Sequence, residues 1–481
     1  MNLYLWLLLL YSLLLISIGV VVSRRVKTAA DFYVAGRKLG PGLLFSTLLA
    51  ANIGASSTVG AAGLGYQYGM SAWWWVGSAG LGSLVLAKWV GPRMWRLARE
   101  REFLTFGDFL EYRYNRRVRL LAAALLWIGT LALLAAQLIG ISIILHVVAG
   151  VPEVAGYWIG GVVVISYYAV GGLWSAARVN SVELTVKLLG FLIALIWAWR
   201  SVGGWSETAV RISQTLGNEG KSMEYLSPVG AGTRWIVNYV VLLAPSFFIS
   251  PGLLQKVFGA RDVKAVRWGA GLNAIGLLSF AVVPALFGVI AYSQFPDLAD
   301  PQNALPTVML RLLPTSLGAL ALAAVFSAEI STCDAILFML STSWSNDLYR
   351  TLFRPQADSR ELLQAGRWAA IVAGLAGIGL AQYLQSIIDA ISVFYGLLVV
   401  ALLVPLLVGL YSSRAGAQTA LWSMILAVST AGMAHFLTRG RSLSYLSPPI
   451  IGILVSAVVF AAHPVKSFIL AKQTGVTSGR S

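Results

Sequence analysis

The chain has 481 residues, of which 58% are apolar and only 11% are charged. Soluble domains carry about 25% charged residues, so this composition excludes a soluble globular protein, and its hydrophobicity excludes a disordered one. The net charge of +16 indicates an excess of Lys and Arg in cytoplasmic loops rather than a nucleic-acid partner. A single Cys, three scattered His and the absence of nucleotide-binding or hydrolase motifs give no support for an enzyme.

Long apolar runs predict thirteen membrane-spanning helices. A bilayer core about 30 Å thick needs roughly 20 apolar residues per helix. These runs are much longer than the roughly 10-residue alternating segments of a membrane barrel, so the expected fold is an all-α multi-pass membrane protein. The predicted spans lie near residues 3–22, 41–66, 71–90, 117–149, 154–172, 176–200, 233–258, 266–294, 315–345, 363–384, 387–411, 415–438 and 447–470.

The charges that flank the first predicted span place the N-terminus outside. No Lys or Arg precedes this span, whereas Arg24, Arg25 and Lys27 follow it, which is the reverse of a cleavable signal peptide. When alternate loops are assigned to the cytoplasm from that point onward, most of the 35 Lys and Arg residues fall inside. The sequence therefore predicts one transporter domain, residues 1–472, in the plasma (cytoplasmic) membrane, followed by a short disordered cytoplasmic tail, residues 473–481.

The second and the seventh predicted spans carry residues that interrupt a helix. Gly54, with serines and a threonine beside it, interrupts the second span within residues 50–60. Pro245 and Pro251 interrupt the seventh within residues 244–252, because each proline removes a backbone donor. The carbonyls freed in this way survive in lipid only against protein, water or an ion. Both prolines are expected to hold their break open.

The spacing of the two interrupted spans indicates an inverted repeat. They lie five spans apart, and because five is odd, the halves that contain spans 2–6 and 7–11 run in opposite directions. These halves cover about residues 41–200 and 233–411. Secondary transporters commonly place their binding site where two such breaks meet near the middle of the membrane.

Several motifs occur in the order that is typical of one transporter family. Together they resemble the sodium:solute symporter family, which includes sodium-coupled proline, pantothenate, sialic acid, choline and glucose transporters. The resemblance covers about residues 25–410 and is most specific in the ninth predicted span. The motifs are residues 31–40, residues 50–53, residues 168–183, and Ser331-Thr332-Cys333-Asp334 followed by Ser341-Thr342 and Asn346-Asp347-Leu348-Tyr349.

The resemblance implies a leucine-transporter-type inverted-repeat fold with a sodium site between the second and ninth spans. Carried over by position, the ligands are the backbone carbonyls of Ala50, Ile53 and Ala328 and the hydroxyls of Ser331 and Thr332. Sodium prefers oxygen ligands, and a neutral cage binds it weakly enough to release it. The alternative for the two hydroxyls is a hydrogen bond to a carbonyl one turn earlier in their own helix.

Ionisable residues within the predicted spans are functional candidates, because each costs several kcal/mol in the bilayer. Glu183 and Lys187 lie four residues apart, so we expect them to form an ion pair on one helix face. Asp334 follows the proposed ligands and is expected to attract the ion toward the cytoplasm. Glu329 is expected to pair with Lys187 or Arg311.

Two positions depart from the pattern of the family. Asn180 stands where the family commonly has an Asp that helps to bind a second sodium, so the resemblance implies one sodium rather than two. Glu183 stands where Gln is common. We therefore include Asn180, Glu183, Lys187 and Asp334 as candidate residues of the ion pathway.

The predicted function is sodium-coupled symport of a small organic solute by alternating access, with sodium as the coupled ion and no obligatory protein partner. A neutral pocket rich in hydroxyls and aromatic rings fits a sugar, an amino acid, a vitamin or a small carboxylate. It is expected to be lined by Asn52, Ser56, Ser57, Ser246, Phe247, Phe248, Ser250, Phe394 and Tyr395.

Two alternative functions of different kinds stay open. If the ammonium of Lys187 reaches the proposed sodium site, it repels sodium, and the transporter is coupled to protons or is uncoupled. The chain could also be a membrane sensor that reuses a transporter fold and needs a partner chain. A membrane enzyme is the least favoured function, because the sequence contains no reactive constellation.

Overall fold

The computed structural model describes residues 29–168, 173–384, 386–412, 416–442 and 445–473, together with Trp6, Leu10, Leu13 and Ser17. Within this part the elements are helices, and Leu39 and Ala260 form an isolated parallel β-bridge. The predicted all-α fold is therefore confirmed. Most of the predicted first span and residues 474–481 of the predicted tail lie outside the described residues.

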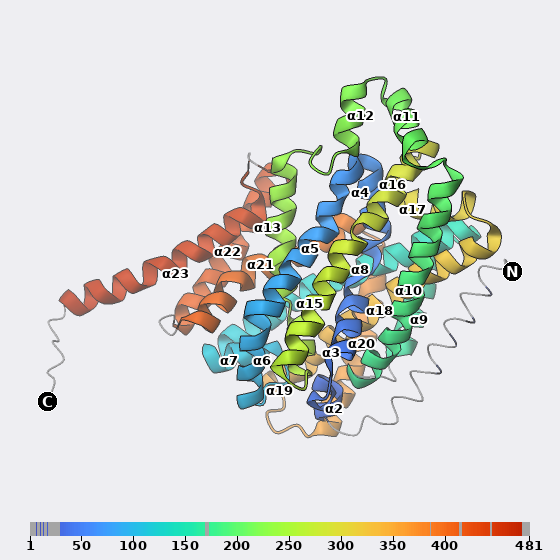
Figure 1. Ribbon diagram of the computed structural model, residues 1–481. Helices are drawn as coiled ribbons and strands as arrows, with labels where there is room; N and C mark the ends of the chain where they lie inside the picture. The colour runs from blue at the N-terminus through green and yellow to red at the C-terminus, as the bar shows by residue number, and fades with distance from the viewer. Residues whose placement is uncertain are drawn as a thin grey trace.

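The helices follow one another along the chain with short connections (Figure 1). The first half contains α2 (Ala29–Val34), η1 (Ala35–Arg37), α3 (Pro41–Asn52), η2 (Ala55–Ser57), α4 (Val59–Tyr68), η3 (Gly69–Ala72), α5 (Trp73–Val85), η4 (Leu86–Val90), α6 (Gly91–Glu100), α7 (Phe106–Arg113), α8 (Arg116–Ala149), α9 (Glu153–Tyr168), α10 (Leu173–Ser201), α11 (Gly204–Leu216) and α12 (Glu219–Leu226). The second half contains α13 (Thr233–Ile249), α14 (Pro251–Phe258), α15 (Val263–Phe280), α16 (Val282–Gln294), η5 (Pro301–Asn303), α17 (Ala304–Arg311), α18 (Thr315–Thr342), η6 (Ser343–Tyr349), α19 (Arg350–Leu352), α20 (Ser359–Ala381), α21 (Ile387–Tyr411), α22 (Ala417–Thr438) and α23 (Pro448–Gln473).

Among the described residues, eight helical segments are long and apolar enough to cross a membrane, and a bent segment that contains α3 makes nine. The apolar stretches 153–166 in α9 and 448–462 in α23 are shorter. The multi-pass architecture is thus confirmed, whereas the count of thirteen spans stays a prediction.

Two long helices occupy the centre of the bundle. The most apolar windows of α8 and α18 are 78% and 83% buried by the rest of the protein, against 22% for α22. The start of α8 is fixed by Asn115, whose side chain accepts from Val118 N, and its end by Gly150 in the left-handed conformation. In Figure 1, α22 and α23 lie on one side of the bundle. The chain's single thiol, Cys333, is free and fully buried on α18.

The predicted break in the second span is present between α3 and α4. The α3 helix ends at Asn52, the 3₁₀ turn η2 follows, and α4 begins at Val59. The axis of Pro41–Asn52 is bent by 77° from the helical run that begins at Ala55. The carbonyls at the end of α3 therefore lack the amide partners that a continuous helix would supply.

The predicted break in the seventh span is shorter than expected. Only Ser250, with φ −55° and ψ 123°, leaves the helical conformation, and α14 starts at once with Pro251 in its first position. Pro245 lies inside α13 and does not interrupt it. The expectation that both prolines hold the break open is therefore wrong for Pro245, because surrounding helical turns carry the chain through it.

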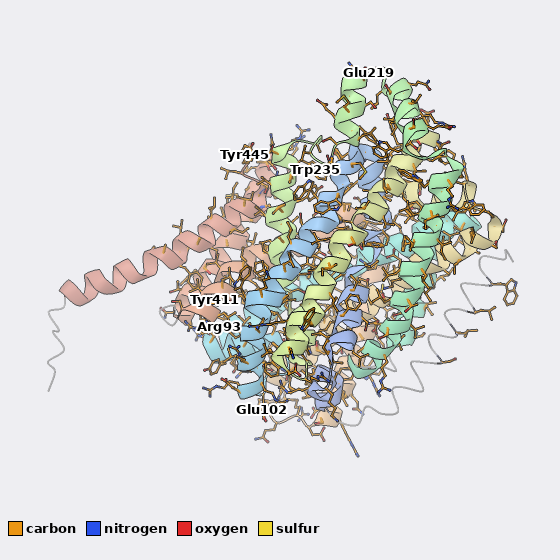
Figure 2. All side chains as sticks on the ribbon, viewed as in Figure 1. Arg93, Glu102, Glu219, Trp235, Tyr411 and Tyr445 are labelled. Carbon is orange, nitrogen blue, oxygen red and sulfur yellow. The ribbon has the colours of Figure 1, made fainter. Side chains whose placement is uncertain are left out.

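The two ends of the bundle differ in their helices. At one end, α11 and α12 form a protruding pair that carries Glu219, and at the other lie α2, α6, α7 and α19 (Figures 1 and 2). We call the second end the α7 end. Arg93 of α6 lies over the ring of Tyr411 of α21, 4.7 Å from its centroid, and so ties α6 to the second half of the chain (Figure 2).

Candidate cation and solute site

All five predicted sodium ligands lie together where α3 ends against the middle of α18. Ser331 Oγ donates to the carbonyl oxygens of Ala50, at 3.0 Å, and Ala328, at 3.1 Å. Thr332 Oγ1 donates to Ile53 O at 3.2 Å and lies 3.5 Å from Ala50 O. The hydroxyls thus bond across to the broken helix, and Ser331 also bonds within its own. We call these five residues the oxygen cage.

The ammonium group of Lys187 lies at the oxygen cage. Lys187 Nζ donates to Ala50 O at 2.9 Å and to Ser331 Oγ. The residue is fully buried on α10, which packs against both α3 and α18. The ammonium group therefore lies among the neutral oxygens of the cage. The lysine side chain is long enough to reach them from α10, which the spacing of residues along the sequence does not reveal.

The predicted ion pair between Glu183 and Lys187 is not formed in the described part of the chain. Glu183 is fully buried, and neither of its carboxylate oxygens has a hydrogen-bond partner among the described residues. Asn180, one turn earlier on α10, donates from Nδ2 to Thr47 Oγ1 at 3.1 Å. The expectation failed because sharing a helix face with Glu183 does not prevent Lys187 from pointing at Ala50 O and Ser331 Oγ instead.

Side chains from other helices hold the break at the end of α3. Ala55 N donates to Gln137 Oε1 of α8 at 2.8 Å, and Thr58 Oγ1 donates to Glu329 Oε1 of α18 at 3.1 Å. Glu329 therefore contacts Thr58, and no ion pair to Lys187 or Arg311 is present among the described residues. These contacts supply the hydrogen bonds that the interrupted helix lacks.

Gly54 is the point of closest approach at this break. A Cβ atom there would overlap Thr332 Oγ1 and Gln137 Oε1. The absence of a side chain lets the backbone of the break lie directly against the oxygen cage. Gln137 gave no signal in the sequence, because a lone Gln in a long apolar run has no spacing to interpret.

A cavity of about 620 Å³ lies beside the oxygen cage, between the two broken helices. Seven of the nine predicted pocket residues line it; Ser57 lines a neighbouring smaller pocket instead, and Phe248 lines neither of these two. The seven are Asn52, Ser56, Ser246, Phe247, Ser250, Phe394 and Tyr395.

The cavity contains a charge that sequence reasoning missed. Lys256 lines it from the last turn of α14, only 3% exposed, and its Nζ donates to Thr47 O at 2.8 Å. Lys256 lies near the end of the predicted seventh span, 233–258, and was not among the candidate site residues. The prediction of a neutral pocket is therefore wrong. Asp334, expected on the ion path, is 4% exposed on α18 and acts on Lys256 electrostatically.

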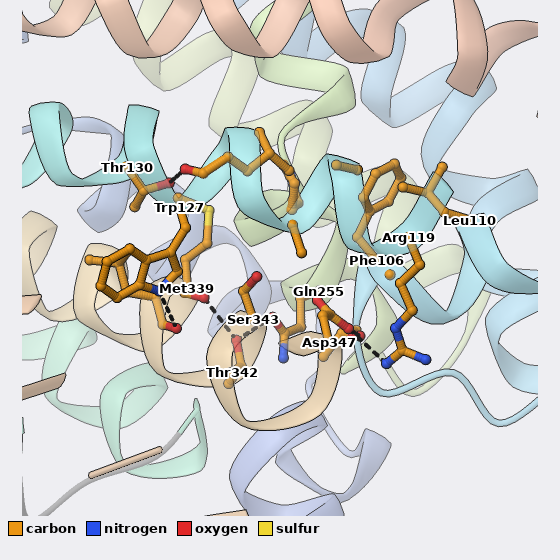
Figure 3. Close-up of a pocket in the computed structure, with 17 residues that line it drawn as sticks. Phe106, Leu110, Arg119, Trp127, Thr130, Gln255, Met339, Thr342, Ser343 and Asp347 are labelled. Atoms are coloured by element: carbon orange, nitrogen blue, oxygen red, sulfur yellow. Dashed lines mark hydrogen bonds and ion pairs between the residues drawn. The ribbon is translucent and has the colours of Figure 1, made fainter. Parts of the chain in front are cut away.

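A separate buried ionic cluster lies at the α7 end. Arg119 at the start of α8 pairs with Asp108 at 2.9 Å, Glu111 at 2.6 Å and Asp347 of η6 at 2.8 Å. The cluster borders a pocket of about 450 Å³, in which Arg119 points toward Asp347 (Figure 3). The motif residue Asp347 thus joins η6 to α7 and α8. Nearby, burial raises the pKa of Tyr33 to about 12.

Comparison with known proteins identifies the family of this arrangement. The sequence model of the sodium:solute symporter family matches residues 32–427. The sodium/pantothenate symporter of Escherichia coli (strain K12) is 28% identical over 473 residues, which cover 94% of each chain. The high-affinity proline transporter of Bacillus subtilis (strain 168) is 24% identical over 465 residues, 92% of this chain and 96% of the relative.

A solved structure shares the fold. A Na⁺-coupled sialic acid symporter, in a substrate-bound outward-open state, superposes with a TM-score of 0.80 at 17% sequence identity and covers 97% of this chain and 98% of that one. This likeness confirms the leucine-transporter-type inverted-repeat architecture. The matched family consists of membrane transporters rather than enzymes. The chain belongs to the sodium:solute symporter family.

Proposed function

We propose that this chain is a secondary active symporter that moves a small organic solute together with sodium by alternating access. The observation that carries the proposal is the convergence of the five oxygen-bearing residues of the oxygen cage at the break between α3 and α4. Neutral carbonyl and hydroxyl oxygens are the ligands that suit a weakly held alkali cation. The family match and the Na⁺-coupled structural neighbour support the same coupling ion.

Lys187 has to leave the cage when sodium binds. Two unit charges about 4 Å apart repel by about 4 kcal/mol at an effective dielectric constant of 20. Glu183 lies one turn earlier on the same helix with both carboxylate oxygens lacking a hydrogen-bond partner among the described residues. In the proposed cycle sodium takes the cage, and the ammonium of Lys187 moves to Glu183. Sodium release reverses this exchange, so the cage keeps one positive charge throughout.

The solute occupies the adjacent cavity. Asn52 at the end of α3 and Ser250 at the break before α14 line it from the two broken helices. Sodium that orders the end of α3 therefore also orders the wall of the solute site, and each ligand raises the affinity for the other to the same extent. We place the α7 end, where α6 carries three Arg residues, in the cytoplasm.

A second candidate function is proton-coupled transport. It is favoured by the direct contact of Lys187 Nζ with Ala50 O and Ser331 Oγ. In this mechanism the amine of Lys187 occupies the cage in place of sodium throughout the cycle. Its protonation and deprotonation drive the conformational change. It predicts transport that follows a pH gradient and is indifferent to sodium.

Uptake into proteoliposomes tests both candidates. Labelled pantothenate, L-proline, sialic acid and D-glucose form the probe panel, with an inward sodium gradient, an equal potassium gradient or an imposed pH gradient. Sodium-stimulated uptake of any probe supports the main proposal. Uptake driven by the pH gradient alone overturns it in favour of the proton-coupled candidate. Sodium-dependent binding without translocation would instead indicate a sensor.

Variants of the oxygen cage locate the coupling site. Ser331→Ala with Thr332→Ala removes two of the five proposed oxygens, so the sodium concentration for half-maximal uptake should rise at least tenfold, equivalent to about 1.4 kcal/mol. Thr315→Ala with Ser316→Ala, at the exposed start of the same helix, is the matched control. An unchanged sodium dependence in the cage variant would refute this site.

Variants of Lys187 separate the two mechanisms. Lys187→Met removes the ammonium group one turn from the buried carboxylate of Glu183 and should lower the thermal stability, whereas adding Glu183→Gln should restore much of that loss. In the exchange mechanism the double variant binds sodium more tightly, because the competing ammonium is gone. In the proton-coupled mechanism the same variant loses gradient-driven transport.

A further inference from the structure

The cavity beside the oxygen cage has one charged residue on its wall. Among the described residues that line it, Lys256 alone carries a charge, and the remainder are hydroxyl, amide, aromatic and aliphatic side chains. The acidic residues Glu183, Glu329 and Asp334 are buried in the surrounding helices and do not line the cavity. A solute in this space therefore lies beside the one lysine of the cavity wall.

The environment of Lys256 leaves that charge without a close counterion. Its Nζ makes one hydrogen bond, to the neutral carbonyl of Thr47, although an ammonium group carries three donors. No carboxylate lies within 4.0 Å of it in the described part of the chain, and Asp334 acts from a greater distance. A buried charge of this kind is costly unless an anion completes it.

The other polar groups of the cavity fit the same ligand. Gln137 and Ser250 are lining residues that offer an amide and a hydroxyl, and Phe247, Phe394 and Tyr395 provide an apolar wall. Gln137 uses its oxygen to hold Ala55 N, so its NH₂ group is the part available to a ligand. These donors, together with the ammonium, match a carboxylate attached to a small organic body.

We propose that Lys256 binds the carboxylate of the transported solute, so that the substrate class is small organic acids and zwitterions rather than sugars. This inference rests on the proposed function for the movement of the solute, but the binding contact stands separately from the coupling ion. The two buried lysines then have different partners: Lys187 contacts Ala50 O and Ser331 Oγ of the cage, and Lys256 contacts the ligand.

Matched acids and amides test the contact in the unmodified protein. Pantothenate against its primary amide, L-proline against L-prolinamide, and acetate against acetamide each differ at the carboxylate. Binding is measured by thermal stabilisation of the purified protein and by competition with the probe that binds most tightly. At least one acid should bind ten or more times more tightly than its amide, and D-glucose should not compete.

Three variants assign the preference to Lys256. Lys256→Met should abolish the preference for acids over amides, Lys256→Arg should retain part of it, and Lys264→Met, which removes an exposed charge at the start of α15, should leave it unchanged. Equal binding of acid and amide in every pair by the unmodified protein overturns the inference, whether or not the variants fold. A preference that survives in Lys256→Met overturns it too.

The outcome separates this inference from the proposed function. Sodium-driven uptake of D-glucose without any acid preference leaves the symport proposal standing and overturns the role of Lys256. A clear acid preference in binding, without uptake on either a sodium or a pH gradient, supports the role of Lys256 and overturns symport.

Discussion

The two helix breaks that face the cavity are built in different ways. Between α3 and α4 the backbone leaves the α-helical conformation over several residues and bends by 77°, and side chains from α8 and α18 bond to it. Between α13 and α14 only Ser250 departs, and Pro251 restarts the helix. The first break therefore depends on tertiary contacts, whereas the second is set by local proline chemistry. This difference is the reason for placing the proposed cation site at the first break alone.

Gly54→Val, at the first break, should have the largest effect on uptake of the four substitutions considered for the two breaks. Its side chain would overlap Thr332 and Gln137, and overpacking of a rigid site costs about 1–3 kcal/mol. We expect loss of uptake by more than tenfold at saturating sodium and solute. Gly42→Ala, in α3 with open space around it, is the control and should transport normally. Normal transport by Gly54→Val would mean that the backbone of this break moves freely.

Gln137→Leu should have the next largest effect. It removes the acceptor of Ala55 N and leaves a buried donor unpaired, which costs about 1–3 kcal/mol. We expect a lower melting temperature and weaker sodium-stimulated binding. The exposed Gln382→Leu is the matched control. If both variants melt at the parental temperature, the break between α3 and α4 does not depend on α8.

Pro251→Ala probes the second break and should act more mildly. A residue before proline is disfavoured in the α conformation, so the substitution lets Ser250 become helical and lets α13 continue into α14. We expect a several-fold fall in the uptake rate and a smaller loss of thermal stability than in Gln137→Leu. Hydrogen exchange at residues 250–254 measures the change directly. Unaltered exchange there would show that the break does not need the proline.

Pro245→Ala should have the smallest effect. This residue lies inside α13, and alanine restores a helical amide without changing the path of the chain. We expect uptake within twofold of the parent. A loss as large as that of Pro251→Ala would show that the interruption extends over both prolines after all.

The fold and the convergence of the five residues of the oxygen cage were largely predictable because they depend on local patterns. Long apolar runs define the helices, and the motif around Ser331 and Thr332 is recognisable at the level of residue types. The groups that the long side chains contact were not predictable. Lys187 lies one turn from Glu183, yet it reaches Ala50, because the packing of α10 against α3 brings that carbonyl within reach.

Lys256 shows a second limit of sequence reasoning. It is the first of several basic residues after an apolar run, which is the usual signature of a cytoplasmic loop. The restart of the helix at Pro251 keeps it inside the bundle instead, because α14 extends to Phe258. A pattern of charges therefore located the end of the span, but the position of the helix break decided which lysine faces the cavity.

The buried thiol of Cys333 can report when this part of the protein changes conformation. It directly follows Thr332 of the oxygen cage, it is fully buried in the described conformation, and it is the single cysteine of the chain. A membrane-permeant maleimide therefore has one target, which reacts only when this stretch of α18 becomes accessible. The rate of that reaction, with and without sodium or solute, measures how often the transporter opens on this face without any engineered label.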